Sequence, residues 1–356
     1  MTKLVEYYAY KSNSSSIGID NKLRQTVETM NKNGYSAKLI YINSSAVHKY
    51  VLLSKLLIGS NADVIIIRNL PALITCSPIL IALRMRGVKV IVDVPTPICV
   101  AVQELKSKKI TSRKIIYELL FRLTFPFALW PASVVLQYSN ESNWFKMGLN
   151  KKTKLIANGI DVNNIAVKKN NIYTGGGDFI MIAVASLASW HGFDRVIRGI
   201  NELYQKNSQS QGVKLLIIGD GDIKQELEDL TNALGVESRV HFYGIQSGEV
   251  LSRLFDSAHL AISSLGLHRI NLELASVLKS REYTARGIPF IATGADIDFS
   301  PTPTFVNIVP NDDSVINISS ILTWYFNNVH NFDPNEIRNY AIKNLDYSIK
   351  INKILN

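Results

Sequence analysis

The sequence predicts an α/β protein made of two doubly wound parallel-sheet domains that face each other across a cleft. Short apolar runs rich in β-branched residues alternate with longer segments of helical period, and this alternation occurs twice along the chain. The apolar runs have no polar face, which is typical of parallel strands covered by helices on both sides. A length of 356 residues is enough for two such domains at roughly 150 residues each.

The elements follow in chain order. The apolar runs of the first half predict strands at residues 4–10, 37–42, 63–67, 88–92, 133–136 and 154–156. The segments between them predict helices at 20–33, 46–58, 76–86, 104–125 and 140–147. In the second half, strands are expected at 179–185, 213–218, 240–243, 259–263 and 290–292. The helices of that half are expected at 193–206, 222–234, 248–257 and 278–286.

A stretch rich in Gly, Asn and Lys between residues 158 and 178 has the composition of a surface linker. We therefore expect an N-terminal domain at 1–165 and a C-terminal domain at 166–333. The last segment, 334–356, has a helical period and could cross back to the first domain.

The composition excludes several classes of protein. A hydrophobic content of 47%, with 20 Gly and 11 Pro, is wrong for a disordered or collagen-like chain. The two cysteines, Cys76 and Cys99, form neither a disulfide framework nor a metal-ligand spacing, which favours a reducing cytoplasm. We expect no secretory signal and no membrane span, because the longest uncharged apolar window, 70–83, is shorter than the roughly 20 residues that a span needs.

The positive charge is concentrated in the first half. Residues 1–165 carry 22 basic and 9 acidic side chains, a net charge of +13, whereas the remainder has a net charge of −3. This asymmetry predicts a polyanionic partner, such as nucleic acid, an anionic membrane surface or phosphorylated substrates. We expect no nucleic acid, because no recognised nucleic-acid motif accompanies the charge.

Basic and aromatic side chains are interleaved within residues 105–129, and this pattern is typical of an interfacial helix on an anionic membrane. The alternative is a buried helix with a solvated basic face. The side chains expected to face the membrane are Lys108, Lys109, Arg113, Lys114, Tyr117 and Phe121.

Two strand–loop–helix turns of the second half could hold an anion. In the first, Ser186, His191 and Gly192 precede a helix whose free N–H groups favour a diphosphate, and His191 would add a side-chain donor. The alternative is an ordinary capped turn. In the second, Gly219-Asp220-Gly221-Asp222 is no dinucleotide fingerprint, because the third glycine is missing. We expect its acidic pair to cap the next helix rather than to bind a metal.

A third stretch, 269–291, is rich in charged residues just ahead of an apolar strand. The side chains expected to form a site there are Arg269, Glu273, Lys279, Ser280, Arg281 and Glu282. Ser280 is expected to cap a helix, the cations can hold phosphates, and Glu282 can accept two hydrogen bonds from a ribose diol. The alternative is a set of surface ion pairs. No carboxylate cluster has metal spacing, so no metal cofactor is expected.

The order of these stretches resembles the retaining, nucleotide-sugar-dependent GT-B glycosyltransferases of family 4, especially the bacterial enzymes that build capsular and other surface polysaccharides. The segments that carry the resemblance are 158–161, 186–195, 218–221, 240–244 and 279–289. The resemblance implies an N-terminal Rossmann-like domain that binds the acceptor and a C-terminal one that binds a nucleotide-diphosphate sugar. A UDP-sugar is the first expected donor, and no cofactor is required.

The resemblance also assigns roles to individual residues. It implies that Glu282 holds the ribose, and it puts Glu273 one place from the position of the family's other glutamate, where Leu274 stands. The nearby Lys279, Arg269 and His191 would supply the positive charge. Tyr243 and Gly244 would line the base pocket, Gly18 would take the place of the glycine-rich loop, and Asp93 would face the acceptor or act as the base.

We therefore expect a glycosyltransferase that is cytoplasmic and peripherally associated with the inner face of the cell membrane. It would move a sugar to a glycan or lipid-diphosphate-linked acceptor. Two alternatives remain open. One is a nucleotide-sugar epimerase of the same architecture, and the other is a catalytically silent partner subunit, because the family's first glutamate is missing.

Overall fold

Two units divide the chain in the computed structural model. The first comprises residues 1–159 and 347–356, and the second comprises residues 160–346. The first boundary lies six residues before the expected position, and the last ten residues are part of the first unit. The structure describes residues 2–10, 17–43, 48–68, 73–95, 97, 123, 127–140, 149, 151–169, 173, 175–206, 212–329 and 332–355.

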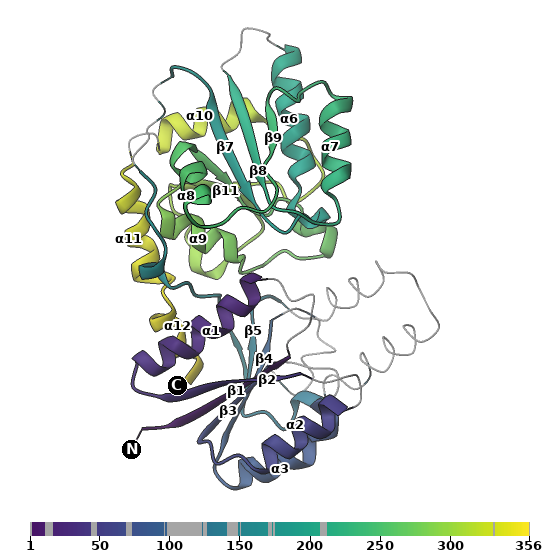
Figure 1. Ribbon diagram of the computed structural model, residues 1–356, viewed down its shortest axis with the longest axis vertical. Helices are drawn as coiled ribbons and strands as arrows, with labels where there is room; N and C mark the ends of the chain where they lie inside the picture. The colour runs from purple at the N-terminus through teal and green to yellow at the C-terminus, as the bar shows by residue number, and fades with distance from the viewer. Residues whose placement is uncertain are drawn as a thin grey trace. The chain divides into compact units, whose positions relative to one another are not determined.

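The first unit contains a six-stranded parallel sheet in the order β2-β1-β3-β4-β5-β6 (Figure 1). Its strands are β1 (Leu4–Tyr10), β2 (Ser36–Ile42), β3 (Val64–Arg68), β4 (Lys89–Val94), β5 (Val134–Gln137) and β6 (Thr153–Leu155). Its helices are α1 (Ile17–Lys32), α2 (His48–Ile58), α3 (Ser77–Met85) and α12 (Tyr347–Leu355). The helices expected at 104–125 and 140–147 lie outside the described residues, apart from residue 123.

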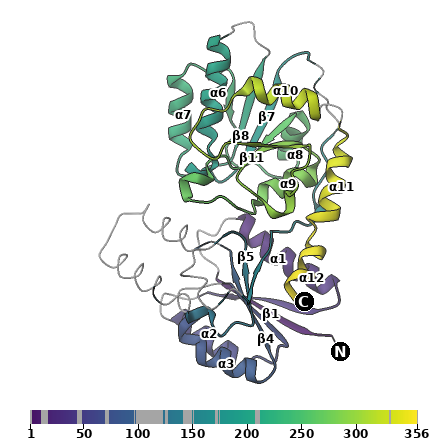
Figure 2. The same ribbon diagram turned by 180° about the vertical axis from the view of Figure 1, so that it is seen from behind.

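Helices cover both faces of this sheet (Figures 1 and 2). α1 and α12 pack on one face against the side chains of Val5 and Ile66. α2 and α3 pack on the other face against Ile65 and Ile67. Successive residues of β3 therefore enter opposite cores, so a buried parallel strand is apolar throughout.

The second unit has the same layered plan, with a parallel sheet in the order β12-β11-β10-β7-β8-β9. Its strands are β7 (Phe179–Val184), β8 (Val213–Ile218), β9 (Val240–Phe242), β10 (Leu260–Ile262), β11 (Phe290–Thr293) and β12 (Val306–Val309). Its helices are α6 (Phe193–Lys206), α7 (Lys224–Ala233), α8 (Gly248–Ser257), α9 (Leu278–Arg286), α10 (Ile318–Asn328) and α11 (Pro334–Asn344). The prediction of two doubly wound parallel sheets is confirmed.

Two parts of the second half differ from the prediction. The strand β12 and the helix α10 were not expected. The terminal segment is two helices rather than one, because α11 ends at Asn344 and α12 begins at Tyr347. Between them the Leu345 carbonyl accepts a hydrogen bond from the Ile160 N–H at 2.9 Å, so the chain pairs there with the start of the second unit.

Candidate active site

The second unit has its topological switch point between β7 and β10, which are neighbours in the sheet. The chain continues from β7 to β8 and β9 on one side, and from β10 to β11 and β12 on the other. Open α/β sheets bind ligands at such a switch point, just beyond the carboxyl ends of the two strands. These two loops contact each other, because the Leu265 N–H donates to the His191 carbonyl at 2.9 Å and the Gly266 N–H donates to the Trp190 carbonyl at 3.1 Å.

Gly192 permits this close approach. Its φ of +64° lies in the left-handed region, and a Cβ atom would be 2.8 Å from the carbonyl carbon of Leu265. Any other residue would be strained and would clash with the backbone. As predicted, α6 begins directly after Gly192, at Phe193. The amino end of this helix therefore lies at the switch point.

His191 is buried, and both of its ring nitrogens have partners. Nε2 is 3.0 Å from the Ser186 carbonyl oxygen, which can only accept, so Nε2 carries the proton. In the neutral ring Nδ1 is then an acceptor, and it lies 3.0 Å from the Ser264 hydroxyl and 2.9 Å from the Lys279 ammonium. Burial, followed by the charge of Lys279, holds the pKa of His191 well below 6.5. This corrects the expectation that His191 supplies positive charge or a free donor.

Lys279 brings a cation to the switch point from the first turn of α9. Its ammonium donates to His191 and lies 5.2 Å from the centre of the Phe193 ring. The His191 and Phe193 rings are stacked, with centres 5.6 Å apart. Desolvation lowers the pKa of Lys279 to about 7. The protonated ammonium, beside the amino ends of two helices, is suited to binding an anion, and a bound anion would favour this charged form.

Helix α9 separates its charged residues onto two sides. Lys279, Glu282 and Arg286 recur at intervals of three and four, so they share a face. One oxygen of Glu282 accepts from Arg286 at 2.8 Å, and its side chain is 29% exposed. Glu282 therefore stays accessible on the face that carries Lys279.

Arg281 points the other way and is fully buried. Its guanidinium forms ion pairs with Asp296 and Asp298, the latter at 3.0 Å. The expectation that Arg281 holds a phosphate is wrong, because two carboxylates already neutralise its charge. Ser280 is not a cap: α9 begins at Leu278, and the Ser280 hydroxyl is buried 2.7 Å from that of Ser263.

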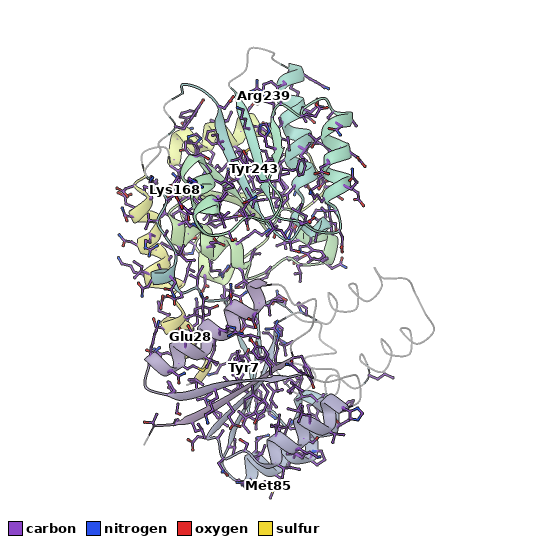
Figure 3. The ribbon with its side chains drawn as sticks, in the orientation of Figure 1. Tyr7, Glu28, Met85, Lys168, Arg239 and Tyr243 are labelled. Carbon is purple, nitrogen blue, oxygen red and sulfur yellow. The ribbon has the colours of Figure 1, made fainter. Side chains whose placement is uncertain are left out.

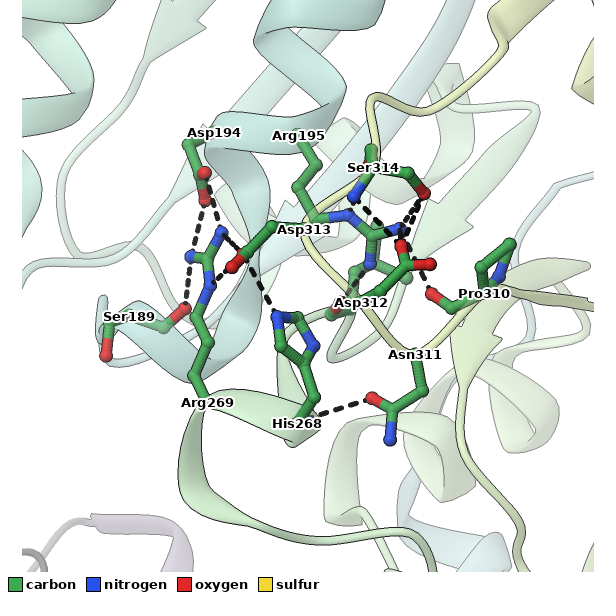
Figure 4. A network of polar contacts seen from close by, with 11 residues as sticks. Ser189, Asp194, Arg195, His268, Arg269, Pro310, Asn311, Asp312, Asp313 and Ser314 are labelled. Atoms are coloured by element: carbon green, nitrogen blue, oxygen red, sulfur yellow. Dashed lines mark hydrogen bonds and ion pairs between the residues drawn. The ribbon is translucent and has the colours of Figure 1, made fainter.

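Arg269 ties two loops together instead of facing a ligand (Figure 4). Its guanidinium contacts both carboxylate oxygens of Asp194 at 2.8 Å, Asp313 at 2.7 Å and the Ser189 carbonyl at 2.8 Å. Hydrogen bonds to Asp194 raise the pKa of Arg269 further. The structure therefore corrects its expected role as a free cation for the diphosphate.

Arg195 is buried and donates hydrogen bonds to several backbone carbonyls (Figure 4). It donates to the carbonyl of Leu265 and to those of Pro310 and Ser314, at 3.0 and 2.7 Å. These bonds fasten the loop after β10 to the segment that follows β12. Arg195 therefore fixes the position of the loop after β10, whose Leu265 contacts His191.

The turn after β8 packs against the loop after β7. The Gly219 N–H donates to the Gly244 carbonyl at 2.7 Å, and a Cβ atom on Gly219, where φ is +131°, would lie 1.8 Å from the Ala185 oxygen. The Asp220 carboxylate accepts from the Gly221 N–H at 2.8 Å. Asp220 and Asp222 do not cap α7, which begins at Lys224 after Ile223 and has no side-chain cap; that prediction was wrong.

Tyr243 follows β9 and is 40% exposed (Figure 3). Its N–H donates to the Ile217 carbonyl at 2.9 Å, which holds the start of this loop beside the β8 turn. Glu273 is exposed on the loop before α9, where its carbonyl accepts from the Ala295 N–H at 2.6 Å. The structure thus gathers the loops after β7, β8, β9 and β10 and the start of α9 at one edge of the sheet.

Asp93 lies elsewhere, within β4 of the first unit, and is 1% exposed. Its carboxylate accepts from the Tyr7 hydroxyl and lines a cavity of about 20 Å³, together with Lys22, Tyr138 and Lys350. This corrects the expectation that Asp93 follows the strand and faces an acceptor. Tyr7 is labelled in Figure 3.

Gly18 is inside the first turn of α1 rather than in a loop before it, which also corrects the prediction. The six side chains expected to face a membrane, Lys108, Lys109, Arg113, Lys114, Tyr117 and Phe121, lie outside the described residues. Sequence reasoning missed Ser264, although its position two residues after the apolar strand β10 was a usable signal. It also missed Asp194, Asp296 and Asp313, whose sequence distance from their arginines gave no signal.

Among the described residues, no group of three or more His, Cys, Asp or Glu side chains could hold a metal ion. In the same part of the chain, no helix is long and apolar enough to cross a membrane.

Residues 165–295 match the family model described as glycosyl transferases group 1. The chain is 31% identical over 120 residues to an uncharacterized glycosyltransferase of Methanocaldococcus jannaschii; the match spans 31% of this chain and 30% of that relative. A second uncharacterized glycosyltransferase of the same organism is 27% identical over 106 residues, which is 28% of this chain and 25% of that protein. The matches therefore span less than a third of the relatives' length.

Solved structures resemble the chain over nearly its whole length. The Anabaena protein HepE in complex with UDP-glucose has a TM-score of 0.64 and 14% identity, with 99% of both chains covered. Sucrose-phosphate synthase from Thermosynechococcus elongatus has a TM-score of 0.67 and 13% identity, with 99% of this chain and 98% of that chain covered. At such identities the likeness shows the fold, which is the GT-B fold.

Proposed function

We propose that this protein is a retaining glycosyltransferase of family 4, which transfers a sugar from a nucleotide-diphosphate sugar to a glycan or lipid-linked acceptor. The observation that carries the proposal is the Lys279 ammonium, which lies 2.9 Å from neutral His191 at the switch point, with Glu282 on the same face of α9. The match of residues 165–295 to the glycosyl transferases group 1 model supports it.

The residues divide the work of binding the donor. Lys279 and the first-turn N–H groups of α6 and α9 hold the diphosphate, and Glu282 accepts hydrogen bonds from the ribose hydroxyls while Arg286 orients its carboxylate. Tyr243 and Gly244 line the base site. The turns at Ser186, Gly192, Gly219, Asp220 and Gly221 shape the backbone around the diphosphate.

The donor sugar would enter a cavity that Ser264, a hydrogen-bond partner of His191, helps to line. The cavity has a volume of about 130 Å³, and its lining includes hydroxyl groups of Ser263, Ser264, Ser280 and Thr293. Such groups can exchange hydrogen bonds with sugar hydroxyls. A UDP-sugar is the first donor to test, because a structural neighbour is described in complex with UDP-glucose.

Breaking the bond between the anomeric carbon and the phosphate oxygen develops negative charge on the departing diphosphate. Lys279 and the helix N–H groups stabilise that charge, which is their contribution to the rate. The acceptor oxygen forms the new bond to the anomeric carbon on the face that the diphosphate leaves, and its proton passes to the departing phosphate oxygen. The configuration of the anomeric carbon is then retained, and the proposed step needs no cofactor.

The acceptor is proposed to belong to a bacterial surface polysaccharide pathway, with the enzyme on the inner face of the cell membrane. The concentration of basic side chains in the first 165 residues supports an anionic surface as its location. A lipid-diphosphate-linked acceptor would be reached there.

The first test is donor binding. Thermal-shift measurements against UDP, GDP, dTDP and CDP should reveal one preferred base, because a ligand at roughly 100 times its Kd raises the free energy of unfolding by about 2.7 kcal/mol. Lys279→Met should remove the shift, whereas Lys343→Met, an exposed lysine of α11, should keep it. If no nucleotide shifts the transition, the donor-site assignment is wrong.

The second test is turnover with the preferred donor and a synthetic lipid-diphosphate-linked monosaccharide. Lys279→Met should lower kcat by about 10²-fold or more, as expected for removal of one transition-state donor. Conversion of the donor sugar without acceptor would identify an epimerase. Donor binding without any turnover would identify a silent partner subunit.

A further inference from the structure

We propose that the outer surface of α2 and α3, with the adjoining segment 127–131, docks on an anionic lipid bilayer. This surface, here called the α2–α3 face, belongs to the first unit. It includes none of the six side chains between residues 108 and 121 that were expected to face a membrane. The inference rests on the proposed membrane location and names a surface that provides it.

Large apolar side chains project from this face into solvent. α2 buries Leu53 and Leu57 in the core but exposes Val51, Leu52 and Ile58, the last at 64%. α3 likewise buries Leu80 and Leu83 but exposes Ile81 at 49% and Met85 at 85%. Met85 is labelled at the edge of the first unit in Figure 3. Exposed apolar residues that gather in this way mark interaction sites more often than single ones do.

The two helices form one surface. α2 and α3 lie side by side in both views (Figures 1 and 2), and the Ser54 hydroxyl of α2 is 3.5 Å from the sulfur of Cys76, the residue before α3. The exposed residues Val51 and Ile58 are seven apart, and Ile81 and Met85 are four apart, so each pair lies on one side of its helix.

An aromatic pair adjoins α3. The Arg84 guanidinium donates to the Pro131 carbonyl at 3.2 Å, which places the preceding Trp130 next to this helix. Trp130 and Phe127 are 45% and 39% exposed, with ring centres 4.8 Å apart in an edge-to-face arrangement. Trp130 has an apolar body and a polar N–H, and such side chains are favoured at the boundary between lipid and water, while Phe127 adds apolar surface.

The α2–α3 face is positively charged, which favours an anionic partner. Residues 48–58 and 77–86 contain no Asp or Glu, and the charged side chains described and exposed there are Lys55, Arg84 and Arg86. The whole first unit has 24 basic and 8 acidic side chains, a net charge of +16, whereas the second has a net charge of −6. Each basic residue near an anionic leaflet contributes about 1 kcal/mol of attraction.

This combination favours a membrane over other occupants. A second copy of the same face would bring two strongly positive units together, which is unfavourable. Nucleic acid would satisfy the charge but would gain little from exposed Ile58 and Met85. A bilayer with anionic headgroups uses both features, because its interface takes up apolar side chains while its phosphates attract the cations.

The test is sedimentation of the full chain with vesicles, without donor or acceptor. The chain should bind vesicles of equal parts phosphatidylglycerol and phosphatidylcholine, and binding to pure phosphatidylcholine should be at least tenfold weaker. The double variant Ile58→Ser/Met85→Ser should weaken binding to the mixed vesicles by about tenfold or more, because each side chain loses its apolar transfer energy. The matched control is Ile245→Ser/Ile342→Ser, which removes side chains exposed to 71% and 48% on the second unit.

Thermal melts of both double variants should match the unmodified chain, since the altered side chains are exposed. The proposal is overturned if the unmodified chain does not bind the mixed vesicles, or if both double variants bind equally. It is also overturned if Ile58→Ser/Met85→Ser dissociates a dimer seen without vesicles, or if the chain prefers a DNA duplex to the mixed vesicles at physiological salt. No readout involves sugar transfer, so failure here and failure of the proposed transferase activity are distinguishable.

Discussion

Donor affinity should depend steeply on pH through Lys279. The proposed site binds the diphosphate with the ammonium form, and desolvation has lowered the pKa of this lysine to about 7 in the ligand-free protein. The group is therefore charged below about pH 7 and loses its proton as the pH rises. A bound anion stabilises the charged form and raises the pKa of Lys279 in the complex. Affinity is then highest at low pH and falls above neutrality.

The magnitude follows from the population of the charged form. With a pKa of about 7, roughly three quarters of Lys279 is protonated at about pH 6.5 and roughly 3% at about pH 8.5. The apparent Kd should therefore rise about 25-fold across this window, which corresponds to about 1.9 kcal/mol. The ring of His191 stays neutral throughout, since its pKa is far lower, so it adds no slope.

Isothermal titration calorimetry of the preferred nucleotide-diphosphate sugar measures this slope, because such a donor has no phosphate group that titrates in the window. Lys279→Arg should flatten the profile, since an arginine stays protonated. Lys279→Met should give a flat profile at weaker affinity, and Lys343→Met should leave both affinity and slope unchanged. A flat profile for the unmodified protein, or a slope that survives in Lys279→Met, would refute the assignment of the diphosphate to this lysine.

Three further substitutions test the structural roles assigned above. Asp93→Asn should leave the donor Kd unchanged and lower the free energy of unfolding by about 2 kcal/mol in urea titrations, because it weakens a buried charged hydrogen bond; loss of transfer at full stability would instead make it catalytic. Gly219→Ala should lower the melting temperature and the donor affinity, because its Cβ would meet the Ala185 oxygen. Its control, Gly235→Ala, has positive φ but no atom within 4 Å, so equal effects would contradict this reasoning. Arg281→Met should lower the free energy of unfolding by about 3 kcal/mol in urea titrations, because it removes the guanidinium that neutralises Asp296 and Asp298, and a neutral result would show that the network is not needed.

Most of the fold was predictable because its signals are local. The limits of α6 and α9 followed from apolar spacing and from Gly192 and Gly287, which flank them. The strand β12 was missed because Asn307 interrupts its apolar run. The helix α10 did carry a signal: the Asn317 side chain accepts from the Ser320 N–H and caps it.

The site was less predictable because its contacts join distant residues. The sequence indicated correctly that the turn before α6 and the start of α9 carry polar side chains. It could not show that His191 and Lys279, 88 positions apart, lie within hydrogen-bond distance. Nor could it show that carboxylates 75 and 44 positions away neutralise Arg269. Spacing reveals partners within one helix, whereas these pairings depend on which strands are neighbours in the sheet.

These pairings explain why cations that looked equivalent in the sequence have different roles. Arg269 and Arg281 each contact two carboxylates. A ligand phosphate would have to displace a carboxylate that the fold already holds beside the guanidinium. Among the described residues, no ion pair joins Lys279 to a carboxylate; its partners, His191 and Phe193, are neutral. An arriving diphosphate therefore meets a charge that the fold has desolvated but not compensated. The binding free energy gained there is available to the ligand, and for this reason the proposed chemistry depends on Lys279 more than on either arginine.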